Sequence, residues 1–221
     1  MSDLERRYTK GQVELRSRNG SGLTIGGYAV AYDKPSRNLG GFIEVTRSTA
    51  FNRVRGQGWP DVMARYNHDD NLLLGTTAAG TLRLRSDDVG LDYEVDLPPS
   101  MSHIHELVER TDVRHSSFAF RMIEDDWGTS DQGYPLRSLV SVALVDVAPV
   151  NSPAYPDATA GLRSLASKFD ADLEEVRSLA ADDNLRKFFA TTGPEKHRAK
   201  PKTLGAAARM AILGREQDPT Q

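Results

Sequence analysis

The stretch TLRLRSDDVGLDYEVDL, residues 81–97, gives the clearest indication of the fold. Apolar and polar residues alternate along 81–85 and again along 91–97, which is the pattern of a strand with one buried face. Between them, residues 87–90 contain aspartate and glycine, which favour tight turns. The stretch therefore predicts an antiparallel β-hairpin.

Further strand-like runs lie on both sides of this hairpin. They occupy residues 23–32, 42–45, 113–122 and 136–150, and Gly26-Gly27 inside the first of them permits a bend. A helix is expected from Ser100 or Ser102, either of which can serve as its N-cap, to about residue 110. Short strands with turn signals and few helices predict an α+β protein, mostly β with flanking helices, whose strands form an antiparallel barrel or sandwich.

The character of the sequence changes after Pro156. The following residues are charged and rich in alanine, and apolar side chains recur there at helical spacing: Leu162, Leu165, Phe169 and Leu173. We predict a domain of residues 1–158 and a helical tail of residues 159–221, in which 191–202 is extended and accessible. Truncation between residues 158 and 165 is then expected to leave a folded core. The alternative is that the tail helices pack permanently on the strands.

Composition excludes several classes of function. The net charge of −3 over 221 residues gives no basic footprint, so nucleic acid is not a predicted partner. The chain has no cysteine, which excludes disulfides, thiolate metal sites and a cysteine nucleophile. No stretch approaches the length of apolar sequence that spans a membrane, and the N-terminus lacks the apolar segment of a secretory signal. The protein is therefore expected to act in the cytoplasm where it is made.

Three short segments bring a histidine, a serine and a carboxylate into or beside strand-like runs. The segments are 65–69 with His68, 116–121 with Ser116 and Ser117, and 145–150 with Asp146. A serine hydroxyl becomes a nucleophile only when a base takes its proton, and the base needs a third group that fixes its orientation. The three residue types together therefore indicate nucleophilic catalysis.

The residues alone leave other interpretations open. His68 has the neighbours of a surface turn, and the two serines can decorate the edge of a strand. Asp146 lies inside an apolar run, where a carboxylate needs a partner, and it can cap a backbone group or pair with an arginine such as Arg121.

The ordered set of motifs resembles the prohead (capsid-maturation) proteases of tailed bacteriophages, which are relatives of the herpesvirus assembly proteases. The resemblance covers about residues 13–158 and comprises segments 27–32, 40–44, 50–51, 67–69, 74–75, 117–120, 146–150 and 153–156. The chain departs from the family at Ala119, where glycine is common, and at Asp146, where glutamate is common and reaches one methylene further.

The resemblance assigns roles to three residues. Ser117, which immediately precedes the Phe-Ala-Phe motif, is the expected nucleophile, with Ser116 as the fallback; His68 is the general base and Asp146 the third member. Neighbouring residues of a strand point to opposite faces, so only one of the two serines can face the histidine. Asp69 is expected to form a turn through its carboxylate.

The other histidines are weaker candidates. His103 and His105 lie about 200° apart on the expected helix and cannot share a metal ion, so no metal and no cofactor is predicted. His115 is a rival base, but it directly precedes Ser116 in a strand and points away from that hydroxyl.

The resemblance implies a barrel of the herpesvirus-protease type and a serine endopeptidase activity. The implied substrates are the scaffolding part of the major capsid protein and the enzyme's own tail, both cleaved inside the immature head in the host bacterial cytoplasm. The portal is a further candidate partner, and the chain is expected to form a homo-oligomer, most simply a dimer. Two alternatives stay open: a catalytically silent internal scaffold with a protease-like fold, and a metal hydrolase that uses the histidines.

Overall fold

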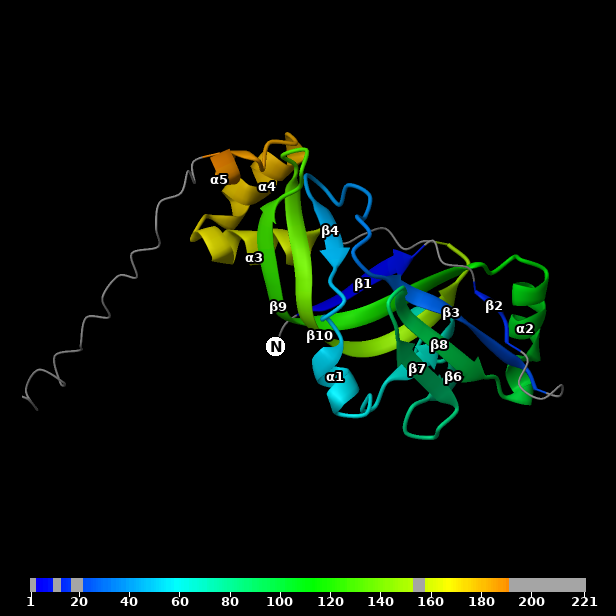
Figure 1. Cartoon of the computed structure of the whole chain (residues 1–221). Coiled ribbons are helices and arrows are strands. Elements are labelled where there is room, and N and C mark those ends of the chain that lie inside the picture. The colour runs from blue at the N-terminus through cyan, green and yellow to red at the C-terminus, as the bar shows by residue number, and fades with distance from the viewer. Residues whose placement is uncertain (1–2, 10–12, 17–21, 153–157, 191–221) are drawn as a thin grey trace, which may run out of the picture. The chain divides into compact units, whose positions relative to one another are not determined.

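The computed structural model describes residues 3–9, 13–16, 22–152 and 158–190, which belong to one compact unit (Figure 1). The motif at 153–156 and the segment predicted to be extended, 191–202, lie outside the described residues. Within the described ranges, no helix has the length and apolarity needed to span a membrane.

Six of the described strands form the larger sheet, in the order β1-β9-β10-β5-β6, with β4 also paired to β10. Their bounds are β1 Leu4–Thr9, β4 Ile43–Thr46, β5 Met63–Arg65, β6 Leu73–Thr76, β9 His115–Thr129 and β10 Pro135–Val150. The long strands β9 and β10 pair antiparallel, and β4 and β5 lie parallel to β10 on its other side. β1 pairs antiparallel with β9 and forms one edge of the sheet (Figure 1).

The smaller sheet has the order β2-β3-β8-β7. Its strands are β2 Glu14–Leu15, β3 Thr24–Ala31, β7 Leu82–Ser86 and β8 Gly90–Asp96. β7 and β8 form the predicted hairpin, and the Asp87 carboxylate accepts hydrogen bonds from the backbone N–H groups of Val89 and Gly90. β3 is one continuous strand, and its irregularity falls between Tyr28 and Val30, not at the two glycines where the bend was expected.

The main core is made of apolar side chains from both sheets. Its most deeply buried members include Ile25, Leu91, Tyr93, Phe118 and Phe120. Phe118 and Phe120 stack with their ring centroids 5.0 Å apart, so their face of β9 is the core face.

The predicted α+β class, mostly β with flanking helices, is confirmed. The described strands form two sheets that do not close into a barrel.

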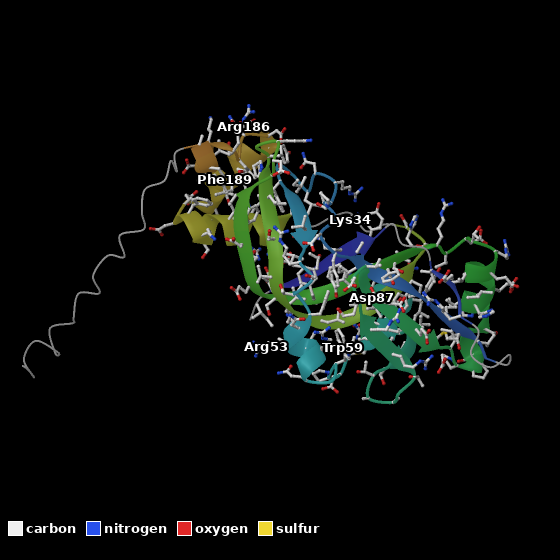
Figure 2. The ribbon with its side chains drawn as sticks, in the orientation of Figure 1. Lys34, Arg53, Trp59, Asp87, Arg186 and Phe189 are labelled. Atoms are coloured by element: carbon white, nitrogen blue, oxygen red, sulfur yellow. The ribbon has the colours of Figure 1, made fainter. Side chains whose placement is uncertain are left out.

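The helical segments flank these sheets. They are α1 Asn52–Gly56, η1 Tyr66–His68, η2 Pro99–Met101, α2 Ser102–Glu109, α3 Thr159–Phe169, α4 Leu173–Ala181 and α5 Lys187–Ala190. The expected helix is α2, which buries Ile104 and Val108. Met101 occupies its N-cap position without a side-chain hydrogen bond, so the predicted serine cap was wrong. Trp59, labelled in Figure 2 near α1, packs on Phe51 of the main core.

A second core joins α3, α4 and α5 to the larger sheet. Leu165, Val176 and Leu185 are buried together with Phe42 and Trp127. Gly161 allows the close approach of α3, because a Cβ at this position would lie 2.5 Å from the Phe42 ring. Phe189 of α5, labelled in Figure 2, extends this core through an edge-to-face contact with Phe169. These contacts favour the alternative in which the helices complete the fold, while the domain boundary after residue 158 stays a prediction.

Truncation tests that boundary. A chain ending at residue 165 loses Val176 and Leu185 from the second core, and each such buried side chain contributes about 1.5–3 kcal/mol. We therefore expect it to unfold with roughly 3–6 kcal/mol less stability than a matched chain ending at Ala190, measured by thermal or urea unfolding. Equal stabilities of the two chains would support a separable tail that begins near residue 158.

A buried cluster of charged side chains fastens β1 to the rest of the sheet. The Arg137 guanidinium donates to Glu5 at 2.7 Å and to Glu44 at 3.1 Å, and Arg7 donates to Glu44 at 2.7 Å. Burial lowers the pKa of Arg137, but the hydrogen bond that it donates to Glu5 and the charges of Glu44, Glu5 and Asp125 outweigh this effect, so the pKa is raised and the side chain stays charged. Breaking such a cluster leaves an unpaired buried charge, which is strongly destabilising.

Candidate active site

Ser117 lies on β9 with its side chain on the face opposite the main core. Phe118 and Phe120 point into the core, so Ser117 and Ala119 point to the other face. Ser116 points to the core side, where its hydroxyl lies 3.3 Å from the Tyr93 hydroxyl. The two serines thus face opposite ways, as the alternation along the strand predicted.

A β-bulge in β10 brings Asp146 to the face of Ser117. Leu144 pairs with Phe120 on the core side, and the next pair along is Asp146 with Ala119, so Val145 is an extra residue. Without this extra residue, Asp146 would share the face of Leu144 and point into the core. The bulge therefore decides where this carboxylate points.

His68 reaches the same place from the end of β5. Asn67 and His68 both have left-handed backbone conformations, with φ of 53° and 58°. Such conformations are uncommon for residues with a side chain, although Asn and His adopt them more readily than most. The side-chain Oδ1 of Asn67 accepts a hydrogen bond from the backbone N–H of Asn151 at 3.1 Å, which links this turn to the end of β10.

The structure brings His68, Ser117 and Asp146 into one hydrogen-bonded chain. His68 Nδ1 lies 2.5 Å from Asp146 Oδ1, and His68 Nε2 lies 2.6 Å from Ser117 Oγ. All three residues are buried, with 7 %, 1 % and 1 % of their surfaces exposed. When the Nδ1–H of the neutral imidazole donates a hydrogen bond to the carboxylate, Nε2 carries no proton and can accept the one from the serine. This is the geometry that an activated serine requires.

Arg65 is part of this site and was not expected from the sequence. Its Nη1 donates to Asp146 Oδ2 at 2.9 Å, so both oxygens of the buried carboxylate have partners. The arginine that contacts Asp146 is thus Arg65 on β5, where sequence reasoning had offered Arg121 on β9. The only signal in the sequence was that Arg65 lies three residues before His68; the contact itself depends on the pairing of β5 with β10 at Asp146.

The remaining candidates lie outside this chain of hydrogen bonds. Asp69 forms the expected turn, because its Oδ1 accepts from the backbone N–H of Asn71 at 2.8 Å. The His115 ring makes an edge contact with Tyr8, and its Nδ1 is buried without a hydrogen-bond partner. His103 and His105 lie on α2. Over the described part of the chain, no cluster of three or more His, Asp and Glu side chains is arranged to hold a metal ion.

Comparison with known families now adds to this geometry. A model of the caudovirus prohead serine proteases matches residues 11–171. The chain belongs to this family. Membership in the prohead protease family implies a serine peptidase of phage capsid maturation that meets capsid proteins inside the immature head. Neither the comparison with curated proteins nor that with solved structures yields a match.

Proposed function

We propose that this chain is a serine endopeptidase whose catalytic residues are Ser117, His68 and Asp146. The observation that carries the proposal is the continuous hydrogen-bonded chain from Asp146 Oδ1 through the imidazole to Ser117 Oγ, at 2.5 and 2.6 Å. Membership in the prohead protease family supports the same assignment.

The proposed chemistry follows from the order of the three groups. Ser117 Oγ forms a bond to the carbonyl carbon of the scissile peptide while its proton passes to His68 Nε2. When the C–N bond breaks, the leaving amine takes that proton and the acyl group stays on Ser117. A water molecule then attacks the ester, giving its proton to His68, and the serine recovers its proton as the acid product leaves. Asp146 stabilises the imidazolium that forms twice in this cycle.

Arg65 is proposed as a positioning residue that acts through Asp146. Its hydrogen bond to Oδ2 fixes the plane of the carboxylate, and Oδ1 is then directed at His68 Nδ1. The exposed carboxylate of Asp70 forms an ion pair with the same guanidinium at 3.1 Å. A carboxylate free to rotate would let the imidazole turn away from Ser117, and misplacements of this kind lower the rate of the chemical step.

Replacing this guanidinium provides a test. We expect Arg65→Met to lower kcat roughly 10- to 100-fold with KM little changed, and Arg65→Lys to restore part of the loss. The matched control is Arg85→Met, because Arg85 is largely exposed and pairs with Asp87 away from the site. A loss of thermal stability without a change in kcat would instead give Arg65 a purely structural role.

The finer aspects of function rest on the family. We propose that the substrates are the scaffolding part of the major capsid protein and a segment of the enzyme's own tail, that the portal is a further partner, and that the enzyme works as a dimer.

Co-assembly with the capsid protein tests this proposal. The full chain is produced together with the major capsid protein of its phage, and the masses of both proteins are followed over time. We expect the capsid protein to lose its N-terminal segment, and to keep it with the Ser117→Ala variant. An intact capsid protein in shells that contain the wild-type chain would instead identify an internal scaffold without activity.

A further inference from the structure

The first strand lies directly on the proposed nucleophile. β1 pairs with β9 so that Tyr8 lies opposite Ser117, and the Ser117 hydroxyl donates a hydrogen bond to the Arg7 carbonyl oxygen at 2.8 Å. Only 1 % of the Ser117 surface is exposed in this arrangement. The proposed nucleophile is therefore covered by a segment of its own chain.

This contact competes with catalysis for a single proton. The Ser117 hydroxyl has one hydrogen, and two acceptors lie within reach: the Arg7 carbonyl oxygen at 2.8 Å and His68 Nε2 at 2.6 Å. A hydroxyl that donates to Arg7 cannot pass its proton to the imidazole. The Arg7 carbonyl also occupies space beside Oγ that a substrate carbonyl needs.

The edge that β1 covers is suited to an extended peptide. β1 is the last strand on its side of the sheet, so the edge of β9 beneath it would otherwise present unpaired backbone groups next to Ser117. Extended peptides commonly bind by adding a strand to such an edge. Residues 4–9 precede the part of the chain that matches the prohead protease family, which begins at residue 11.

We propose that β1 is an internal competitor, which occupies the place of the substrate strand on β9 and must leave before a peptide can reach Ser117. The inference rests on the proposed peptidase function and adds its regulation. β1 is held in place from the core side by Glu5 and Arg7, whose charges pair with Arg137 and Glu44. The backbone of this strand therefore makes the blocking contact with Ser117, while its side chains Glu5 and Arg7 hold it in place.

Cutting the chain behind β1 after folding tests this proposal. The recognition sequence of a site-specific protease is inserted between Thr9 and Val13, and the rate of reaction with a fluorophosphonate, which modifies activated serines, is measured before and after cutting. We expect cutting to raise the rate about tenfold or more. Because only molecules with a displaced β1 react, a tenfold increase means that β1 is displaced in at most about one uncut molecule in ten. A synthetic peptide of residues 3–10 in excess should lower the rate again.

A reversible lock gives the opposite test. Leu4 and Arg121 are directly paired on β1 and β9, and opposite residues of antiparallel strands are close enough for a disulfide. The chain has no other cysteine, so Leu4→Cys with Arg121→Cys can form only one intramolecular bond. We expect the oxidised protein to stay slow after cutting and the reduced protein to react fast, with the two single-cysteine variants unaffected by reduction.

The outcomes separate the two proposals. Equal rates before and after cutting, or in the oxidised and reduced forms once mass measurement has established the disulfide, would overturn the role of β1 and leave the peptidase assignment standing. No reaction of Ser117 in any form would overturn the peptidase assignment, and the inference with it.

Discussion

Replacing Ser117 by alanine is expected to abolish cleavage of the capsid protein. The loss should be roughly 10⁴- to 10⁶-fold in turnover, because no other group can form the acyl intermediate. The fold should persist, since the variant keeps the β9 backbone pairing and removes only a hydroxyl whose partners are His68 and the Arg7 carbonyl. Cleavage is measured by the mass of the capsid protein, and folding by thermal unfolding.

The neighbouring serine supplies the matched control. Ser116→Ala removes the same atoms one residue away, on the core face, where the hydroxyl contacts Tyr93 at 3.3 Å. We expect this variant to keep most of its activity and to lose about 1 kcal/mol of stability at most. The reverse pattern would make Ser116 the nucleophile, and full activity in both variants would reject serine catalysis.

His68→Ala is expected to be nearly as damaging as the loss of Ser117. The imidazole is the group that the structure places within hydrogen-bond reach of the hydroxyl on one side and of Asp146 on the other. Without it, the hydroxyl keeps its proton and reacts slowly, so turnover should again fall by roughly 10⁴-fold or more.

The double variant distinguishes a joint role from two separate roles. Catalytic groups that act as a unit have non-additive effects, so His68→Ala with Ser117→Ala should be no slower than either single variant. His115→Ala is the control histidine, because that ring makes an edge contact with Tyr8 and its buried Nδ1 has no hydrogen-bond partner. If the His115 variant lost activity while the His68 variant stayed active, His115 and not His68 would be the general base.

Alternation along the chain was enough to predict the hairpin and the faces of the two serines. In each case one face of a strand is packed against the core, so a period of two residues fixes where every side chain points. Phe118 and Phe120 carry that information for β9, and Leu91, Tyr93 and Val95 carry it for β8.

The position of Asp146 illustrates what the same reasoning could not provide. Strict alternation places Asp146 on the face of Leu144, which is the core face, and the extra residue Val145 reverses this. A bulge is set by the pairing of two strands, and its location is not contained in the pattern of one of them. Arg65 was missed for a related reason, because its contact with Asp146 depends on the parallel pairing of β5 with β10.

β1 was not predicted because its sequence, Leu-Glu-Arg-Arg-Tyr-Thr, lacks the apolar face of an ordinary strand. Its inward positions are Glu5 and Arg7, and burying them is possible only because Glu44 and Arg137, distant in sequence, supply opposite charges. The packing of the helices after residue 158 likewise depends on residues distant in sequence, because Phe42 and Trp127 are their partners in the second core.

The measurement that tests the central claim most directly is the identity of the serine that reacts with a fluorophosphonate. The native chain is reacted to completion, so that the covering by β1 affects the rate and not the outcome, and the modified peptide is sequenced by mass spectrometry. The proposed hydrogen-bonded chain predicts a single adduct, on Ser117, that is absent from the His68→Ala variant. An adduct on Ser116 or on another serine, or no adduct while the chain is folded, would contradict it.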